Sequence, residues 1–526
     1  MTSTSTLIRT LLVYSICLPL AVFLGYTIAQ EGNPLFNPAT YFVVGIVFFV
    51  LALPLVLRWH HALLIVTWNL GAMLFFIPGR PDLWWAVAWL SFFASVIQYI
   101  LTRKRPFLHA PGVARSLIFL AVVVLATAAL TGGIGLAAFG GAIQGGKRYL
   151  LMLTAIAAYF ALISQPIRLD HAPRYVTLFF ITALTGIISE LGPILPPGLY
   201  YIFLLFPISN YGIRAIVNDP GSHVSAVARL GSLSFAAFSA YCAMMARYGI
   251  SQLVDCRHFV RLLVFLACVV ASFLGGFRSI LVQMIFIAAL VFWLEGLIRS
   301  RLFPVMILVT ALCGAVLISF ANRLPLNVQR TLSVLPGVQI DPIARQDAQS
   351  SSEWRINIWK HLVPQVPKYL LIGRGLGFST SDLQSFITVS PTSGLGEASS
   401  EGTELVSDYH NGPFSIIMPF GIFGVIGFLW FLAASFRVLR QNYHYGHPAL
   451  RRVNTFLYGF FISKTIFFFA VFGNLYSDLG LFTGIVGLSV SINGGVAKRM
   501  ILVPARLRQH PPHPMPGARK PTAVAA

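Results

Sequence analysis

Long apolar runs separated by short polar connectors make up most of this chain. A helix needs about 20 residues to cross the hydrocarbon layer of a bilayer, and the runs between Leu7 and Ala497 are about that long. Only a helix satisfies its own backbone hydrogen bonds in this pattern, so the sequence predicts an all-α polytopic membrane bundle. We expect about fourteen transmembrane helices, at approximately 7–29, 41–57, 62–78, 83–101, 114–138, 148–165, 174–192, 228–248, 259–277, 279–298, 302–320, 413–436, 453–473 and 479–497.

One further apolar segment, 195–215, is doubtful because Pro196, Pro197 and Pro207 interrupt it. Its sequence is compatible with a membrane span and with a re-entrant or interfacial helix, since proline is tolerated in spans. When it is left out, the Lys and Arg residues of the short connectors and of both chain ends gather on one side. Short basic connectors face the cytosol. We therefore expect both termini in the cytosol and residues 322–410 on the outer side.

The predicted topology divides the chain into four parts. Residues 1–321 hold eleven helices, 322–412 form one large outward-facing periplasmic loop with amphipathic helices, and 413–497 hold the last three helices. Residues 498–526 are a basic, proline-rich tail that we expect to be a disordered cytosolic end. The large loop is the one long water-facing segment, so we expect the chemistry there and at its edges.

Composition narrows the function classes. Hydrophobic residues make up 57% of the 526 residues and charged residues 10%, which excludes an ordinary soluble protein. The formal net charge of +21 lies largely in the connectors, without a basic stripe and interleaved aromatics, so we expect no nucleic-acid partner. The five cysteines show neither a disulfide framework nor metal-ligand spacing. The first outer loop, Gln30 to Thr40, has Glu31 as its single acid, so we expect no metal and no other cofactor.

His410 is the leading candidate for chemistry. It lies at the membrane boundary at the end of the large loop, and an imidazole titrates near neutrality and accepts a proton from a hydroxyl. Asp408, two residues earlier, is placed to orient the ring or to raise its basicity. The structural alternative is an interfacial histidine that only caps a helix.

Two arginines enter spans from the same predicted side as the loop. Arg278 lies in the minimal turn of Gly275 to Ser279, and Arg229 opens the span at 228–248. A guanidinium binds phosphate or pyrophosphate bidentately, which makes both residues candidates for a phosphate site. An arginine that binds lipid phosphates at the membrane interface is an equally good interpretation.

The stretch from Glu353 to Lys360 predicts an amphipathic helix lying along the membrane surface. Arg355 and Trp359 are four residues apart, hence on one face, where they are placed to hold a charge and to stack on a sugar. The glycine-rich turn around Arg374 is a weak phosphate-binding signal, because it lacks the strand and helix of a nucleotide fingerprint.

One charge falls inside a predicted span. Lys464 lies in the middle of 453–473, and a charge in the bilayer is usually paired or functional. Glu190 is a candidate partner.

These pieces, in their order along the chain, resemble the O-antigen ligase and polymerase superfamily of bacterial membrane glycosyltransferases. The resemblance covers about 225–437. It rests on Arg229-Leu-Gly, Gly276-Phe277-Arg278-Ser279, Arg355 with Trp359, the glycine turn at 371–378, and His410-Asn411 followed by the glycine-spaced run at 421–427. A stretch at 388–403, rich in Ser, Gly and Glu, departs from the pattern as an insertion before the histidine.

The resemblance implies a metal-independent glycan transfer outside a bacterial inner membrane. The donor would be a glycan on undecaprenyl pyrophosphate, and the acceptor a hydroxyl of lipid A-core or of a second glycan chain. The resemblance implies that Arg278 and Arg229 bind the pyrophosphate and that His410 is the general base. Arg355, Trp359, Arg374, Asp408 and Asn411 then position donor and acceptor.

Several alternatives stay open on the sequence. Ligation onto a lipid A-core and polymerisation of repeat units need the same donor site and differ only in the acceptor. A transporter or flippase of a lipid-linked or anionic substrate would use Lys464 and Glu190 as a midplane site, with the outer loop as a lid. A non-catalytic scaffold of envelope assembly is the third possibility.

Overall fold

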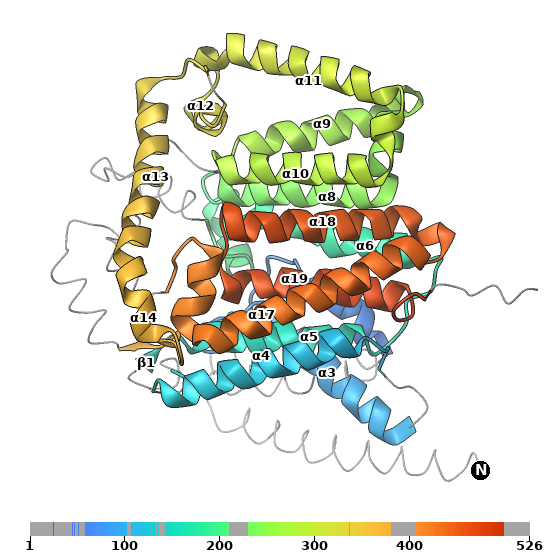
Figure 1. Cartoon of the computed structure of the whole chain (residues 1–526), viewed down its shortest axis with the longest axis vertical. Coiled ribbons are helices and arrows are strands. Elements are labelled where there is room, and N and C mark those ends of the chain that lie inside the picture. Colours follow the sequence, from blue (N-terminus) through green and yellow to red (C-terminus); the bar gives the residue numbers. More distant parts are fainter. Residues whose placement is uncertain are drawn as a thin grey trace, which may run out of the picture.

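The computed structural model describes residues 58–102, 107–132, 134–135, 143–209, 230–335, 337–379 and 407–498, besides isolated positions before residue 58. The predicted spans at 7–29 and 41–57, the insertion at 388–403 and the tail after 498 therefore lie outside the described residues. Within them the chain is a helical bundle (Figure 1), and the prediction of an all-α membrane protein is confirmed.

Eleven long helices of the described part run side by side. Seven are long and apolar enough to cross a membrane when the 3-10 segments that extend α6 and α18 are included, so the larger predicted count of spans stays a prediction. The helices are α3 (Leu83–Thr102), α4 (Pro111–Leu130), α5 (Gly146–Leu162), α6 (Ala172–Ile181) continued by η3 (Thr182–Glu190), α8 (Gly231–Leu253), α9 (Phe259–Phe273), α10 (Arg278–Leu294), α11 (Leu302–Ser319), α17 (Gly412–Tyr445), α18 (Arg451–Ala470) and α19 (Leu475–Ile492).

The centre of the bundle is aromatic and closely packed. Phe428 of α17, Phe461 of α18 and Phe482 of α19 are fully buried, and the ring of Phe482 lies 5.4 Å from that of Phe461 and 5.7 Å from that of Phe428. Gly487 lets α19 approach α5, because a Cβ there would lie 3.0 Å from Cδ1 of Leu162. Small residues at such crossings allow the close backbone approach on which membrane helix packing depends.

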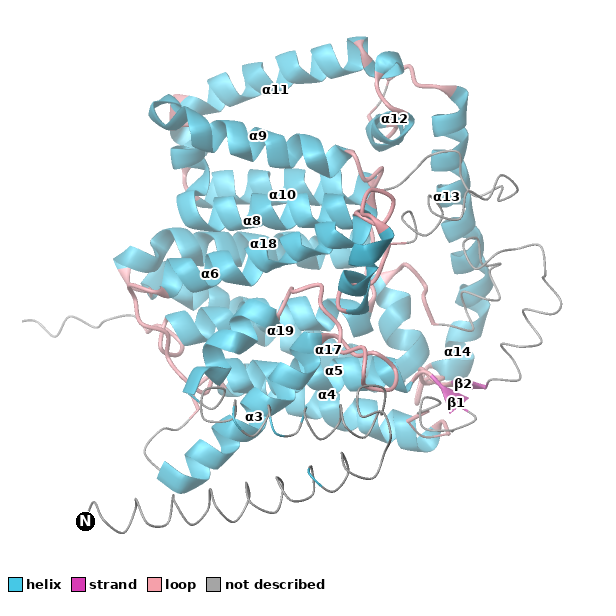
Figure 2. Ribbon diagram, turned by 180° about the vertical axis from the view of Figure 1, so that it is seen from behind, coloured by secondary structure: helices cyan, strands magenta, loops and turns pink. Residues whose placement is uncertain are grey.

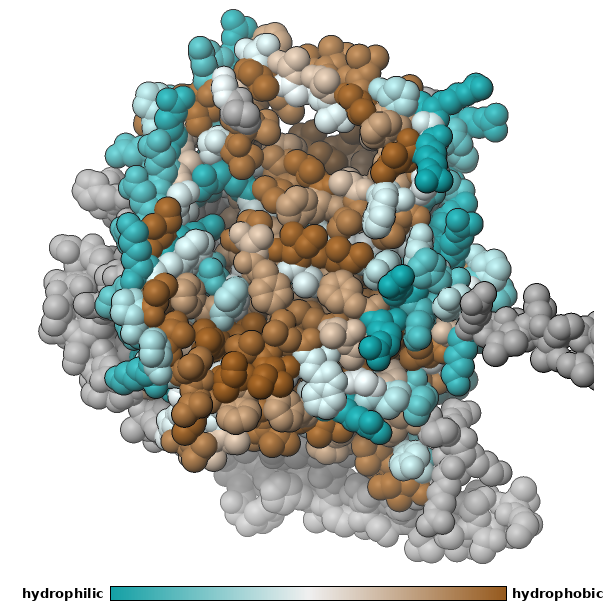
Figure 3. All heavy atoms as spheres, viewed as in Figure 1, coloured by the Kyte–Doolittle hydropathy of each residue, from teal (hydrophilic) through white to brown (hydrophobic). Residues whose placement is uncertain are grey.

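The rim of the bundle faces the membrane. No residue of α11 is buried, and leucine, isoleucine and valine side chains cover it. Figure 3 shows an apolar band across the middle of the helices, with hydrophilic residues gathered at their two ends. This distribution is the one expected of helices that cross a hydrocarbon layer.

The segment between α11 and α17 crosses one end of the bundle. Here α13 (Pro342–Leu362) runs across the ends of the other helices, between the short helices α12 (Leu326–Leu332) and α14 (Val366–Tyr369), as Figures 1 and 2 both show. The helix begins where Asp341 accepts a hydrogen bond from the amide of Ile343, with Pro342 in the first turn. The predicted helix at Glu353 to Lys360 is thus confirmed as part of a longer one. We call this end of the bundle the α13 end.

A two-residue antiparallel pair completes the α13 end. Strand β1 (Ile143–Gln144) pairs with β2 (Phe378–Ser379). The remaining 3-10 turns of the described part are η4 (Pro197–Leu204), η5 (Cys256–His258), η6 (Leu297–Arg299), η7 (Ala321–Arg323), η8 (Val363–Gln365) and η9 (Pro448–Leu450).

Two sequence predictions about the spans have a clear outcome. The predicted span at 62–78 is wrong in its bounds, because residues 58–67 are helical and the chain then turns, with Asn69 donating to the carbonyl of Phe179. The doubtful segment at 195–215 contains only η4 in its described part. Ser209 returns to the end of η3, where its amide donates to the carbonyl of Ser189, so the chain from 189 to 209 leaves and re-enters the same end of the bundle.

Candidate active site at the α13 end

His410 lies in the turn that leads into α17, and its backbone is strained. Its φ is 49°, a left-handed conformation that is costly for a residue with a Cβ and that clusters at functional sites. The imidazole lies between two aromatic rings, with centroid distances of 5.1 Å to Trp354 of α13 and 5.1 Å to Phe472. These neighbours fix the plane of the ring.

The carboxylate of Asp408 faces His410 without bonding to it. Its Oδ1 is 3.8 Å from Nδ1 of His410, while the same oxygen accepts a hydrogen bond of 2.9 Å from Nδ2 of Asn474. Burial lowers the pKa of His410 below its ordinary value, Asp408 acts in the opposite direction, and the charge of Arg355 lowers the pKa further. The net shift favours the neutral imidazole, which is the form that accepts a proton.

His410 lines a cavity of about 640 Å³ under α13. Its upper wall contains Trp354 and Arg355 from α13, and its lower part reaches Gln283 of α10 and Lys464 of α18. The walls combine aromatic rings with serine, amide and charged side chains, and the cavity is large enough for a small ligand. Arg355 contributes a fixed positive charge, with its guanidinium carbon 5.8 Å from the ring centre of Phe472.

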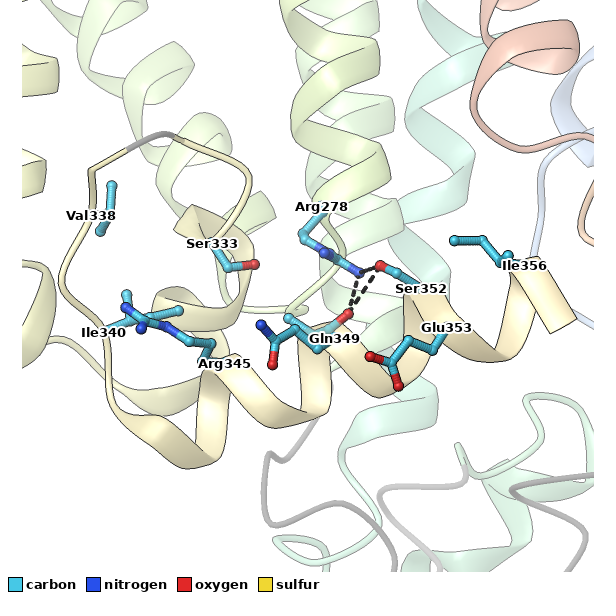
Figure 4. Close-up of a pocket in the computed structure, with 10 residues that line it drawn as sticks. Arg278, Ser333, Val338, Ile340, Arg345, Gln349, Ser352, Glu353 and Ile356 are labelled. Atoms are coloured by element: carbon cyan, nitrogen blue, oxygen red, sulfur yellow. Dashed lines mark hydrogen bonds between the residues drawn. The ribbon is translucent and has the colours of Figure 1, made fainter.

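Arg278, the first residue of α10, holds α13 to the bundle. Its Nη2 donates to the carbonyl of Ala348 at 2.9 Å and to Oγ of Ser352 at 3.1 Å. Figure 4 shows its guanidinium at the edge of a second cavity of about 500 Å³, which Arg345 and Glu353 also line.

A third cavity, of about 210 Å³, shares lining residues with both of the others, and we call it the linking cavity. Arg278, Arg330 and Arg355 all line it. Arg278 and His410 therefore do not line one common cavity, and Arg355 belongs to both the linking cavity and the His410 cavity. The structure brings the two arginines and the histidine to the same end of the bundle, in adjoining spaces.

Sequence reasoning missed Arg330, the most buried charge of this region. Its Nε donates to Asp347 of α13 and its Nη1 to the carbonyl of Gly276, directly before the Phe277-Arg278 turn. It therefore anchors both α13 and the turn that carries Arg278. Nothing in the local sequence marks it, because its partners are distant in the chain.

Three predicted site residues have structural contacts outside these three cavities. Asn411 is the N-cap of α17, since its Oδ1 accepts from the amide of Phe414 at 3.1 Å. Trp359 donates from Nε1 to the carbonyl of Tyr409 at 3.2 Å. The turn of Arg374 docks on the kink of α17, where the amide of Arg374 donates to the carbonyl of Met418 at 2.7 Å.

Lys464 is paired, but with a residue that sequence reasoning did not consider. Its Nζ lies 2.7 Å from Oδ1 of Asp478 at the start of α19. Glu190, the predicted partner, accepts hydrogen bonds from Oγ of Ser209 and the amide of Ser232 instead. The predicted Lys464–Glu190 pair is wrong because η3 ends beside α8 and not beside α18.

Arg229 lies outside the described residues. In the described ranges, no three His, Cys, Asp or Glu side chains gather closely enough to hold a metal ion.

The family model described as O-antigen ligase matches residues 263–429, which run from α9 through α13 to the middle of α17 and include Arg278, Arg355 and His410. No curated protein matches the chain. Over residues 263–429, about a third of its length, the chain is similar to the O-antigen ligase family.

Proposed function

We propose that this protein transfers a glycan from undecaprenyl pyrophosphate to an acceptor hydroxyl, without a metal ion. The observation that carries the proposal is the position of Arg355, which lines both the cavity of His410 and the cavity of Arg278. The proposed base, His410, and the arginines proposed to bind phosphate thus lie in two cavities that share the side chain of Arg355. This is the arrangement that a displacement at an anomeric carbon needs.

The linking cavity is the proposed pyrophosphate site. Guanidinium groups bind phosphate oxygens bidentately and stabilise the charge that develops on a leaving group. Arg278 and Arg355 line this cavity, and Arg229 is the further proposed ligand from the family motif. Arg330 already bonds to Asp347 and Gly276, so its role is to hold the others in place.

The proposed reaction is a single displacement. The acceptor oxygen forms a bond to the anomeric carbon, the bond from that carbon to the pyrophosphate oxygen breaks, and the acceptor proton passes to His410. Asp408 lies on the Nδ1 side of the ring, which favours the tautomer with hydrogen on Nδ1 and leaves Nε2 to accept the proton. Undecaprenyl pyrophosphate leaves with its charge held by the arginines.

The proposed setting is the bacterial inner membrane, with the α13 end on the periplasmic side and both termini in the cytosol. The proposed topology has about fourteen transmembrane helices. The acceptor is either lipid A-core, which makes the protein a ligase, or a second lipid-linked glycan, which makes it a polymerase. A gel of surface polysaccharide from a deletion strain separates these: accumulated single repeat units indicate a polymerase, and long glycan left on its carrier indicates a ligase.

The test of the reaction is a transfer assay in membranes with His410→Ala and Arg278→Ala. Each variant is expected to insert normally and to lose most activity, about a hundredfold or more. The matched controls are His444→Ala and Arg437→Ala, exposed residues towards the opposite end of α17. Activity near that of the wild type in either site variant contradicts the role assigned to that residue.

A further inference from the structure

The His410 cavity has a polar floor inside the bundle that the reaction described above does not use. Gln283 lies five residues into α10, about 7 Å below its first residue, and Lys464 lies about 9 Å below the end of α18 at the α13 end. Both line the cavity, together with Asp478 and Ser477 at the start of α19. These polar groups therefore lie inside the bundle, between helices that are otherwise largely apolar.

Gln283 is an unsatisfied donor at this floor. The residue is 7% exposed, and among the described residues nothing accepts a hydrogen bond from its Nε2. A buried polar group without a partner costs about 1–3 kcal/mol, so native proteins seldom keep one that has no use. A bound molecule with a hydrogen-bond acceptor would satisfy it.

Lys464 and Asp478 give the floor charges of both signs. Their ion pair spans 2.7 Å, and the other carboxylate oxygen of Asp478 accepts from the amide of Asn474 at 3.0 Å. The pair is close to neutral as a whole, so the floor suits a neutral molecule with several polar groups better than a free anion. Arg355 and Arg278, which line the linking cavity, lie outside this pair.

The walls above the floor carry five aromatic rings besides serine and acidic side chains. Phe235 and Phe467 come from α8 and α18, Phe277 lies directly before α10, and Trp354 and Phe472 flank His410. Flat apolar walls with a few convergent polar groups are typical of sites for small polar ligands with apolar faces. A pyranose ring has this character, since its hydroxyl groups point outward along the ring edge and its C–H bonds form the two faces.

We propose that the Gln283–Lys464 floor binds the terminal sugar of the acceptor and selects which sugar is accepted. The inference rests on the proposed function, because it places the acceptor on the side of the base. His410 lines this cavity, whereas Arg278 lines the other two, so the donor phosphates lie away from the floor. Helices α8, α10 and α18 contribute the lower part of the cavity, which suits the end of a chain and not a sugar that continues on both sides.

A binding experiment without any transfer tests this. The purified full-length protein in nanodiscs is titrated, without donor, with methyl glycosides of glucose, galactose, mannose, rhamnose and N-acetylglucosamine. At least one is expected to bind, and Gln283→Leu should weaken that binding about tenfold or more, because it removes a hydrogen bond on which discrimination depends. Geranyl pyrophosphate, a probe for the arginine cluster, should bind both proteins equally.

Thermal unfolding separates a ligand group from a structural one. Gln283→Leu replaces an unsatisfied donor with an apolar side chain, so its Tm should stay equal or rise. The matched control is Gln98→Leu, at the far end of the bundle, where Gln98 accepts from Nε2 of Gln165 at 3.2 Å. That variant should lose stability and keep sugar binding.

The outcomes are decisive in both directions. The proposal is overturned if no glycoside binds the wild-type protein, if Gln283→Leu binds as well as the wild type, or if Gln283→Leu loses sugar and pyrophosphate binding together with stability. Sugar binding that depends on Gln283, in a protein whose His410→Ala variant keeps full transfer activity, upholds the floor and rejects the assigned base. The two failures are therefore distinguishable.

Discussion

Asn474 donates a hydrogen bond of 2.9 Å from Nδ2 to Oδ1 of Asp408, and this bond fixes the carboxylate that faces His410. The same residue is tied to Asp478 through its backbone amide, at 3.0 Å. A line of polar contacts thus runs from Lys464, buried in α18, through Asp478 and Asn474 to Asp408 beside His410. The packing of α18 against α19 is thereby connected to the position of the His410 imidazole.

The first prediction concerns the charge of Asp408. Asp408→Asn removes a negative charge that raises the pKa of His410, so the pKa should fall further below its ordinary value. The neutral ring then persists to lower pH, and the acid limb of kcat/KM should move to lower pH. The measurement is a pH profile of transfer, with Asp170→Asn, an exposed acid in the connector before α6, as the control. An acid limb of kcat/KM that stays in place or moves to higher pH contradicts the effect of Asp408 on the pKa of His410.

Replacing Arg355 should shift the pKa of His410 in the direction opposite to that expected for Asp408→Asn. Its charge lowers the pKa of His410, so Arg355→Gln should raise that pKa and move the acid limb to higher pH. The maximal rate should also fall about a hundredfold, because a charge placed to stabilise the leaving group is lost. Arg355→Lys keeps the charge and should restore the limb while leaving the rate low. If Arg355→Lys restores both the acid limb and the maximal rate, bidentate binding of phosphate by this side chain is not required.

Asn411 is expected to contribute stability and no chemistry. Its side chain caps α17, and loss of such a cap costs about 1 kcal/mol. Asn411→Ala should therefore lower the free energy of unfolding by that amount, while Asn411→Asp and Asn411→Ser, which also cap helices, should behave like the wild type in both stability and transfer. Loss of transfer in a stable Asn411→Ser variant would give the amide a role in positioning substrate.

The glycine turn at 373–375 should be intolerant of a side chain. Gly373 has a φ of 86°, and a Cβ there would overlap the carbonyl of Pro419 at the kink of α17. Gly373→Ala should cost about 1–3 kcal/mol from the backbone conformation alone. Gly198→Ala is the matched control, because nothing lies within 4 Å of its Cβ position. Equal unfolding temperatures for the two variants would show that the turn is not pressed against α17.

The Lys464–Asp478 pair predicts a double-mutant result. Lys464→Met leaves the carboxylate of Asp478 buried and uncompensated, which should cost about 3 kcal/mol or more of stability. Adding Asp478→Asn removes that charge and keeps an oxygen that can accept from the amide of Asn474, so the double variant should recover much of the loss. Unfolding by denaturant in detergent measures all three proteins. A double variant no better than Lys464→Met would show that the two charges are not coupled.

The sequence alone determined the class of the protein and most of its helices. Apolar runs and the bilayer thickness placed α8, α17 and α18 within a few residues of their observed starts, because a span depends on local hydrophobicity. Local pattern also predicted the amphipathic helix that became α13. It misplaced the span at 62–78, where an apolar run is part helix and part turn, since hydrophobicity does not separate the two.

The tertiary structure decided which charged groups meet. Asn474 and Asp408 are 66 residues apart, Arg278 and Ser352 are 74, and Arg330 and Asp347 are 17, so no local pattern could pair them. Sequence reasoning named His410, Asp408, Arg278 and Arg355 as individual candidates, but it missed Arg330, Gln283, Asn474 and Asp478. Whether a buried charge is satisfied depends on which helix packs beside it, and that is a property of the folded bundle.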